Sequence, residues 1–251
     1  MSGHSKWATI KRQKGVADAR RGQLFTKLAR EIIVAARQGG GNPEANFKLR
    51  LVIQKARDNN MPIDNIDRAI KRGTGESGTG SLVELTLEGY GPSGVAILVA
   101  ALTDNKNRTL SEVRNVFSKH GGNLSESGGV AWQFETKGVI TVDKTGIDAD
   151  DIGLIGIDAG ADDVKIESDY IEIYTTPQNL EAVRKAVEEK AKIISADVSP
   201  LPAQTVLLAE KEAIQTLKLL DHLEELDDVQ QVFSNMDFSE DVAEKLRAQT
   251  A

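Results

Sequence analysis

The 251-residue chain contains no cysteine, and aromatic residues make up only 4% of it. Without cysteine the protein forms no disulfide, binds no metal through thiolates and has no cysteine nucleophile, which suits a reducing compartment. Its longest apolar runs, such as VAILVAAL from Val95 to Leu102, are far shorter than the ~20 residues of a membrane-spanning helix. The polar N-terminus also has no apolar signal-peptide core. The sequence therefore predicts a cytoplasmic globular protein with no membrane partner.

Motifs typical of cofactor sites are scarce. Gly73 to Gly78 (GTGESG) and Gly89 to Gly94 (GYGPSG) both match G-x-G-x-x-G. A dinucleotide site needs this motif between a strand and a helix, whereas the first match follows an expected helix and the second joins two expected strands. We therefore interpret them as a linker and a turn, and expect no cofactor.

Metal and acid–base signals are equally weak. The histidines are far apart in the sequence and lack zinc-ligand spacing: they are His4, His120 and His222. The paired acidic residues lack the spacing of a calcium-binding loop, and solvated caps and turns explain most of them. These pairs are Asp150/Asp151, Asp162/Asp163 and Asp227/Asp228. We expect no metal site and no enzyme activity.

What the chain does have is a strong charge asymmetry under its formal net charge of −7. Residues 1–75 hold 16 Lys and Arg against six Asp and Glu, a formal charge of +10, whereas the remainder holds 15 against 32, or −17. Such an asymmetry points to contact with a polyanion such as nucleic acid. A basic helical surface docked against acidic neighbours explains the charges equally well on this ground alone.

A segment with the composition of a flexible linker, GTGESGTGS from Gly73 to Ser81, separates two kinds of hydrophobic periodicity. Helical periodicity precedes it and predicts three helices. The second is expected to begin with Asn42 as its cap, and the third near Pro62 with Ile63, Ile66 and Ile70 facing inward.

Strand patterns follow the linker, at 82–88, 95–102 and 130–134, and the capping box TLSE predicts a helix that begins at Thr109. Residues 138–202 show the order βαββαβ of a ferredoxin-like domain, and a helix at 210–224 and a strand at 229–233 come after it. The predicted fold class is α+β with three domains: an all-helical N-terminal domain followed by two α/β domains of ferredoxin-like type. The expected bounds are 1–75 for the first, 76–136 plus 203–240 for the second, and 137–202 for the third, inserted into the second.

The basic region forms a candidate nucleic-acid surface. Helical geometry places Leu24, Leu28 and Ile32 on one side of the first helix and a row of cations on the opposite side. Repeated long cations suit phosphate contacts, and Trp7 in the preceding arm suits stacking on an unpaired base, although it could equally be a hydrophobic plug. The predicted nucleic-acid-binding residues are Lys6, Trp7, Lys11, Arg12, Lys14, Arg20, Arg21, Lys27, Arg30 and Arg37.

Several long strings resemble the YebC family of bacterial and organellar proteins, in the family's order and over nearly the whole chain. They include GHSKWATIKRQKGVADARRGQLFTKLAREI, ARDNNMPIDNIDRAIKRGTG, EGYGPSGVAILV, TDNKNRT, GGNLSESGGVAWQF and DDVQQVFSN. The resemblance implies three domains, the third inserted into the second. It also implies a nucleic-acid partner, since members are described as DNA-binding transcriptional regulators or are associated with translation and the ribosome.

Three functions remain open at this stage. The first is a non-enzymatic, DNA-binding transcriptional regulator, for which Gln13, Gln23 and Asn46 are candidate base contacts. The second is a translation factor that binds ribosomal RNA, which the dominance of Lys and Arg on the basic face favours, because such side chains contact backbone more than base edges. The third is a protein-interaction scaffold, and in every case the acidic domains are candidate docking sites for protein partners.

Overall fold

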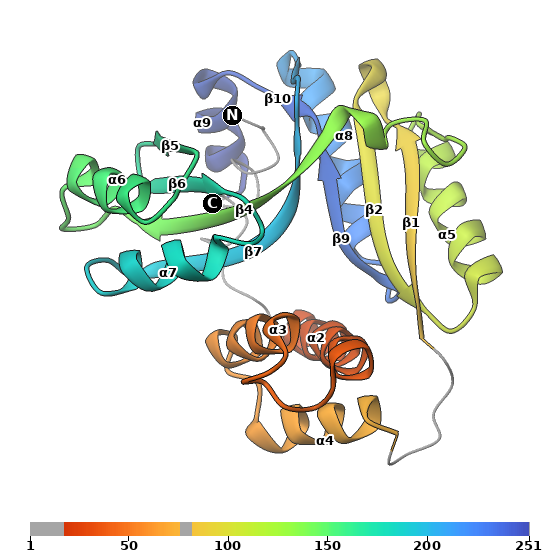
Figure 1. Cartoon of the computed structure of the whole chain (residues 1–251). Helices are drawn as coiled ribbons and strands as arrows, with labels where there is room; N and C mark the ends of the chain where they lie inside the picture. Colours follow the sequence, from red (N-terminus) through yellow and green to blue (C-terminus); the bar gives the residue numbers. More distant parts are fainter. Residues whose placement is uncertain (1–17, 76–81, 251) are drawn as a thin grey trace. The chain divides into compact units, whose positions relative to one another are not determined.

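The computed structural model describes residues 18–75 and 82–250, and side chains within 22–75, 82–239 and 241–246 (Figure 1). The chain forms two compact units. Unit 1 consists of Met1–Phe134 and Pro202–Ala251, and unit 2 consists of Glu135–Leu201. Unit 2 is thus an insertion in the sequence of unit 1. The overall class, a helical N-terminal region followed by parts that contain sheets, confirms the predicted α+β fold; the exact three-domain bounds stay a prediction.

The N-terminal region contains three helices, α2 (Asp18–Gly39), α3 (Phe47–Asp58) and α4 (Ile63–Gly73). Their apolar stripes meet in a core whose central side chains, Leu28, Ile32 and Leu49, are at most 1% exposed. Helix α4 approaches α2 so closely at Gly73 that a Cβ there would lie 2.5 Å from the carbonyl oxygen of Ile33. A side chain larger than hydrogen at this position would therefore push the two helices apart.

Two details of the helical region differ from the prediction. Asn42 forms a turn, and α3 begins four residues later than expected, capped by Asn46, whose side-chain oxygen accepts a hydrogen bond from the amide of Leu49 at 3.0 Å. Ile63 is 67% exposed rather than inward, whereas Ile66 is buried. At the first residue of α4, Ile63 precedes the turn that packs on α2, so periodicity alone places it wrongly.

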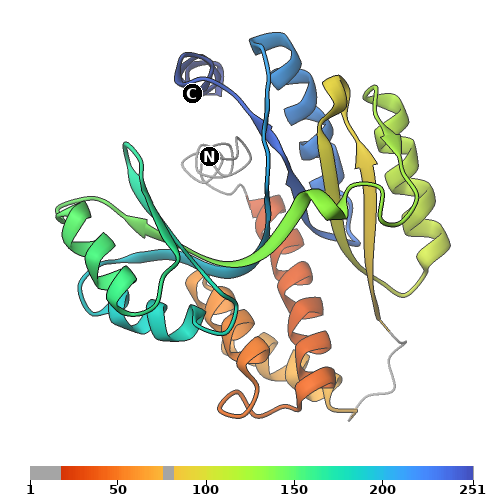
Figure 2. The same ribbon diagram turned by 45° about the horizontal axis from the view of Figure 1, so that its top comes forward.

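The larger sheet of unit 1 has the order β3-β1-β2-β9, and Figure 2 shows its yellow strands, β1 and β2, side by side. Its strands are β1 (Val83–Tyr90), β2 (Ala96–Thr103), β3 (Asn123–Leu124) and β9 (Val229–Ser234), paired antiparallel. Helices α5 (Lys106–Lys119) and α8 (Glu210–Glu224) pack on one face, where Val99, Phe117 and Leu220 share a core. The element order β-β-α-β-α-β differs from that of unit 2.

Sequence patterns misplaced two elements in this unit. Helix α5 begins three residues before Thr109, capped by Asn105, so Thr109 is buried inside the helix instead of capping it. The expected strand at 130–134 is a single 3-10 turn, Ala131–Gln133, and the strand expected from Gly138 begins already at Phe134 as β4 (Phe134–Asp143). Three C-terminal elements were not expected: β8 (Val206–Leu207), β10 (Met236–Asp237) and α9 (Glu240–Thr250).

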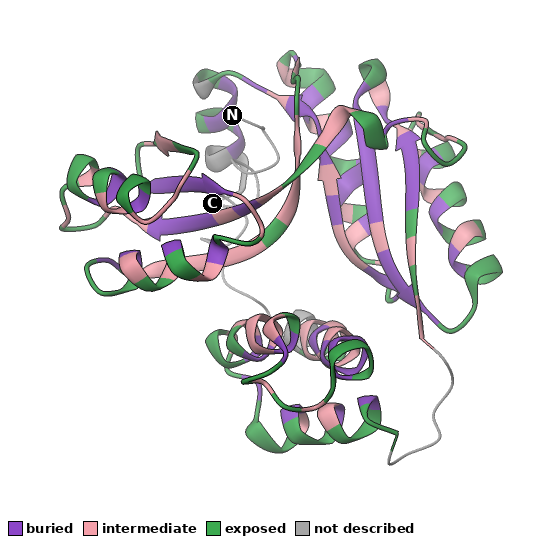
Figure 3. Cartoon of the chain, in the orientation of Figure 1, coloured by how far each residue is buried: buried purple, intermediate pink, exposed green. Residues whose placement is uncertain are grey.

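Unit 2 has the predicted βαββαβ order and the sheet order β5-β6-β4-β7. After β4 come α6 (Ala149–Asp158), β5 (Asp163–Ile166), β6 (Tyr170–Thr175), α7 (Leu180–Glu188) and β7 (Ile193–Pro202). Strand β6 is buried along its whole length (Figure 3). None of the helices in the described part of the chain has the length and apolar content to span a bilayer.

Candidate nucleic-acid interface

The structure describes only part of the predicted basic surface. Five of its ten residues lie outside the described residues: Lys6, Trp7, Lys11, Arg12 and Lys14. Arg20 and Arg21 fall in the first turn of α2. The remaining three, Lys27, Arg30 and Arg37, have described side chains, and the arrangement of these three can be compared with the prediction.

Lys27 and Arg30 contact the acidic turn, residues 224–228 (EELDD), between α8 and β9. Lys27 Nζ donates to the carbonyl oxygen of Glu224 at 2.6 Å, and Arg30 donates to the carbonyl oxygen of Asp227 at 2.6 Å and to Oδ1 of Asp228 at 2.9 Å. The last carbonyls of a helix have no partner within the helix and carry its negative dipole end, so cations are favourable there. Two cations expected on an open face are therefore half-buried, Lys27 against the C-terminal end of α8 and Arg30 against the turn that follows it.

The acidic turn is organised around Asp228, whose side chain is 4% exposed. Its Oδ2 accepts hydrogen bonds from Arg108 at 2.6 Å, from the Thr109 hydroxyl at 2.7 Å and from the Thr103 hydroxyl at 3.1 Å. Burial disfavours the charged carboxylate, but these donors outweigh it and hold the pKa of Asp228 below its usual value. Asp228 therefore joins α2, the end of β2 and the start of α5, and is not the solvated cap that its sequence pattern suggested.

The candidate base-reading residues are also engaged within the chain. Gln23 donates its amide to the carbonyl oxygen of Glu225 at 2.7 Å. Asn46 is buried and donates its amide to the carbonyl oxygens of Ala35 and Gly40, both at 2.8 Å, while its oxygen caps α3. Asn46 is therefore a structural residue, and the expectation that it contacts bases is wrong. Gln13 lies outside the described residues.

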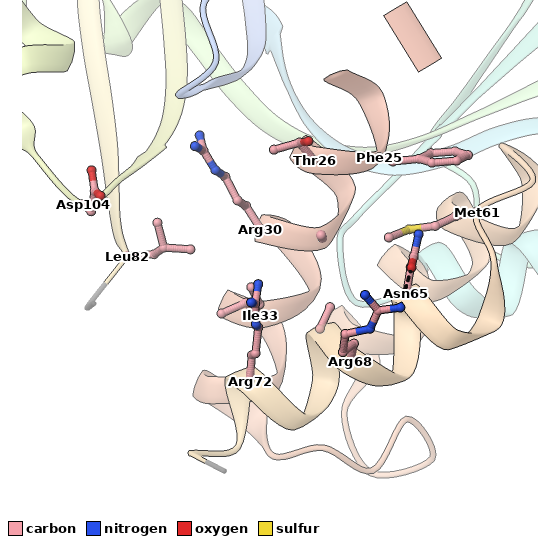
Figure 4. Close-up of a pocket in the computed structure, with 12 residues that line it drawn as sticks. Phe25, Thr26, Arg30, Ile33, Met61, Asn65, Arg68, Arg72, Leu82 and Asp104 are labelled. Atoms are coloured by element: carbon pink, nitrogen blue, oxygen red, sulfur yellow. Dashed lines mark hydrogen bonds between the residues drawn. The ribbon is translucent and has the colours of Figure 1, made fainter. Parts of the chain in front are cut away.

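A second set of cations lies on or near α4. A groove of about 490 Å³ runs between α2 and α4, with Arg68 and Arg72 on its α4 side (Figure 4). Arg68 donates to the side-chain oxygen of Asn65 at 3.1 Å, and this oxygen faces Arg68 while the amide nitrogen points the other way. Sequence reasoning missed Asn65, Arg68 and Arg72, although their i, i+3, i+7 spacing puts them on one face of a helix.

Arg37 is exposed and donates only a backbone contact, to the carbonyl oxygen of Leu82 at 3.1 Å. Throughout residues 18–75 and 82–250, Arg57, Lys71 and Arg72 are exposed and make neither an ion pair nor a side-chain hydrogen bond. An unpaired, exposed guanidinium or ammonium group keeps its full capacity to bind a phosphate. The helical region thus holds two kinds of cation, some bound to the acidic turn and some open to a ligand.

The structure also brings together two of the three histidines. The rings of His120 and His222 lie 4.4 Å apart between centroids, and the Nδ1 atom of each lies within hydrogen-bond distance of the carbonyl oxygen four residues earlier. In the described part of the chain, no group of three or more His, Asp and Glu side chains is placed to hold a metal ion. The pair therefore joins the C-terminal end of α5 to the last turn of α8.

A second buried carboxylate holds the segment 125–134. Glu88 accepts hydrogen bonds from the amides of Gly128, Val130 and Ala131 at 2.7 to 2.8 Å. Burial opposes its ionisation, yet these three donors keep the pKa of Glu88 below its usual value. The segment presents Trp132, which is 75% exposed.

Comparison with known proteins supports the resemblance stated above. A family model described as the TACO1/YebC protein N-terminal domain matches residues 5–76, and one described as the TACO1/YebC second and third domain matches residues 82–236. The chain belongs to the TACO1/YebC family. Residues 82–236 alone are more than half of the sequence, and the two matches leave only short ends and the linker uncovered.

Relatives match the TACO1/YebC chain from end to end. A probable transcriptional regulatory protein of Dehalococcoides mccartyi is 59% identical over 250 residues, covering 99% of this chain and 100% of its own. A protein of the same description from Herpetosiphon aurantiacus is 52% identical over 251 residues with the same coverage. The crystal structure of a conserved hypothetical protein from Aquifex aeolicus has a TM-score of 0.82 and 48% identity, and the match covers 88% of this chain and 92% of that one. These matches support a family of regulatory proteins.

Proposed function

We propose that this chain is a cytoplasmic, non-enzymatic, DNA-binding transcriptional regulator, and that its basic N-terminal 75 residues contact the nucleic acid. The observation that carries the proposal is the charge of that region, +10 in a chain of −7, together with Arg57, Lys71 and Arg72, which are exposed and have no partner within residues 18–75 and 82–250. Cations of this kind displace the counterions of a polyanion, which is the main source of affinity for nucleic acid. The names of the relatives, probable transcriptional regulatory proteins, support the same role.

The −17 charge of the remaining residues restricts where a nucleic acid can bind. Like charges repel over about 8 Å at physiological ionic strength, so the acidic part turns the nucleic acid toward the basic region. The same acidic surfaces are candidate sites for protein partners.

Binding of the full-length chain to labelled DNA, both as a duplex and as a single strand, tests the proposal, with potassium chloride varied from low to physiological concentration. The test variant is Lys11→Ala/Arg12→Ala/Lys14→Ala, and the matched control, Lys185→Ala/Lys190→Ala/Lys192→Ala, removes the same charge from exposed lysines of unit 2. If each of the three basic-arm side chains meets a phosphate, the log–log salt slope falls by about 2.7 in the test variant. The control should keep the parental slope. Equal loss in both variants, or no binding by the parent chain, would contradict the proposal.

The principal alternative is a translation factor that binds ribosomal RNA, which the Lys and Arg content of the basic region also suits. Crosslinking in cells, followed by sequencing of the bound DNA and RNA, separates the two functions. Enrichment at promoters supports the transcriptional regulator, and enrichment of ribosomal RNA replaces it with the translation factor. Enrichment of neither would leave the protein-interaction scaffold as the remaining function.

A further inference from the structure

The groove between α2 and α4 combines apolar side chains with cations that have no acidic partner among the described residues. Its apolar lining comes from α2, from the residues just before and within α4, and from the residue before β1: Phe25, Ala29, Ile33, Met61, Ala69 and Leu82. The volume of about 490 Å³ lies within the range of roughly 300 to 1,000 Å³ that is typical of ligand sites. Ten of its twelve lining residues belong to the helical region, so the groove is essentially a feature of that region.

The charges around the groove leave a positive excess on α4. Among the ionisable lining residues, Arg30 is paired with Asp228, and Asp104 is paired with Arg108 at 2.9 Å. Arg68 makes its hydrogen bond to a neutral amide, and Arg72 has no partner among the described residues. Two guanidinium groups one helical turn apart are therefore available to an anion, and their planar donor arrangement matches phosphate oxygens.

A polar group with spare hydrogen-bonding capacity lies in the same row. Asn65 accepts from Arg68 through its oxygen, and its amide nitrogen makes no hydrogen bond to any described residue. In Figure 4 this nitrogen lies on the side away from Arg68, toward the end of the groove where Phe25 and Met61 are drawn. Asn65 thus offers two N–H donors in a groove that Phe25 and Met61 also line.

We propose that this groove binds an unpaired nucleotide of a nucleic-acid strand, with its phosphate on Arg68 and Arg72, its base over Phe25 and Met61, and a base acceptor on the amide of Asn65. Stacking of bases on aromatic side chains beside a cationic track is the usual way in which proteins hold single strands. In a duplex the bases are paired and stacked inside the helix, so a concave apolar site would remain empty. The inference rests on the proposed function, because it names the strand form that the basic region selects.

Fluorescence anisotropy of the full-length chain tests this with four labelled probes of matched sequence: 12-nucleotide single-stranded RNA and DNA, and the corresponding duplexes. The groove variant is Arg68→Ala/Arg72→Ala. The control, Arg57→Ala/Lys71→Ala, removes the same charge from two exposed cations of the helical region that do not line the groove. Thermal unfolding of each variant checks that the fold is retained.

We expect the groove variant to lose at least about 10-fold in affinity for single strands, because two charge-assisted phosphate contacts disappear, and the control to lose only about 2- to 3-fold. Asn65→Ala should weaken single-strand binding about 3- to 10-fold while leaving duplex binding unchanged. The RNA and DNA arms tell which sugar the site accepts, and preference for either supports the proposal.

Two outcomes separate this inference from the proposed function. If the parent chain binds the probes but the groove variant and the control lose affinity equally for single strands and duplexes, the groove is only part of a general basic surface and the inference is overturned. The inference is also overturned if the parent chain binds duplexes more tightly than single strands and the groove variant weakens that duplex binding. If the parent binds none of the four probes at any salt concentration, the proposed function itself fails.

Discussion

The cations on α2 and those on α4 carry the same charge but are used differently. Lys27 and Arg30 on α2 reach carbonyl and carboxylate oxygens of the acidic turn, whereas Arg68 and Arg72 on α4 line the groove and meet no acidic side chain in the described part of the chain. The difference shows that position on the polar side of a helix does not make a cation available to a ligand. What decides availability is whether another element of the same chain supplies the anion first.

The largest effect is expected when the acidic turn loses its central carboxylate. Asp228→Ala removes the acceptor for Arg30, Arg108 and two buried hydroxyl groups, and should lower the free energy of unfolding by about 3 kcal/mol. Urea denaturation followed by circular dichroism measures the loss. Asp227→Ala is the matched control, because Asp227 is exposed and Arg30 contacts its backbone oxygen, so a change within about 0.5 kcal/mol is expected. Equal losses in the two variants would show that the buried carboxylate is unimportant.

Glu88 should behave like Asp228, since it is also a buried carboxylate that accepts several hydrogen bonds. Glu88→Gln leaves one acceptor oxygen for three backbone amides and should cost about 2 kcal/mol. Hydrogen exchange of the amides of Val130 and Ala131 should accelerate together with that loss. Glu84→Gln, on the same strand and exposed, is the control and should leave this exchange unchanged. Parental exchange rates in Glu88→Gln would rule out Glu88 as the anchor of this segment.

The acidic turn should also give stability a dependence on acid pH. Because the pKa of Asp228 is lower in the folded chain than its ordinary value of 3.8, its stabilisation is complete above that value and is lost as the pH falls toward the folded pKa. The difference in urea midpoint between the parent and Asp228→Asn should therefore be largest at neutral pH and shrink below about pH 3.8. Glu88 is present in both proteins, so its own pH-dependent contribution to stability cancels in the difference between their urea midpoints. A difference that stays constant from pH 7 to pH 3 would mean that Asp228 does not act as a carboxylate.

The smallest effect is expected when one cation of α2 and one cation of α4 are replaced separately and compared. Arg30→Ala should cost about 1 kcal/mol of stability, because its ion pair with Asp228 is partly buried, whereas Arg72→Ala should cost less than about 0.5 kcal/mol. The two variants should rank in the opposite order by their loss of affinity for single-stranded nucleic acid, because only Arg72→Ala should weaken that binding markedly. Thermal unfolding and anisotropy on the same preparations measure both. If the two variants rank in the same order in both measurements, the division into structural and binding cations is wrong.

Much of the secondary structure followed from local pattern. Helix α8 has the predicted bounds, and the βαββαβ order of unit 2 was readable because strands and helices there alternate with clear turn residues. The wrong predictions concern residues whose hydrogen-bond partners are distant in the sequence. Thr109 matches a helix cap locally, but it is buried under Asp228, which is 119 positions away. The sequence around Asn46 does not reveal that its amide is used within the fold, because its partner on α2, the carbonyl oxygen of Ala35, is brought to it only by helix packing.

The candidate site shows the same limit. Periodicity predicted Lys27 and Arg30 on the side opposite the helical core, but it contains no information about the turn at 224–228 that contacts them. The same periodicity could have predicted that Asn65, Arg68 and Arg72 share one face of a helix. It could not have predicted the groove that they line, because the groove forms only when α2 packs against α4. Their role in binding stays a prediction, as does that of the residues before α2.

Peptide mapping of the contact surface tests the central claim most directly. The full-length chain is irradiated with ultraviolet light in complex with labelled nucleic acid, digested, and analysed by mass spectrometry for crosslinked peptides. We predict crosslinks within residues 1–75, including peptides that contain Phe25 or Met61 when the strand is unpaired. Crosslinks confined to residues 82–250 would place the contact on the acidic part of the chain and contradict this prediction.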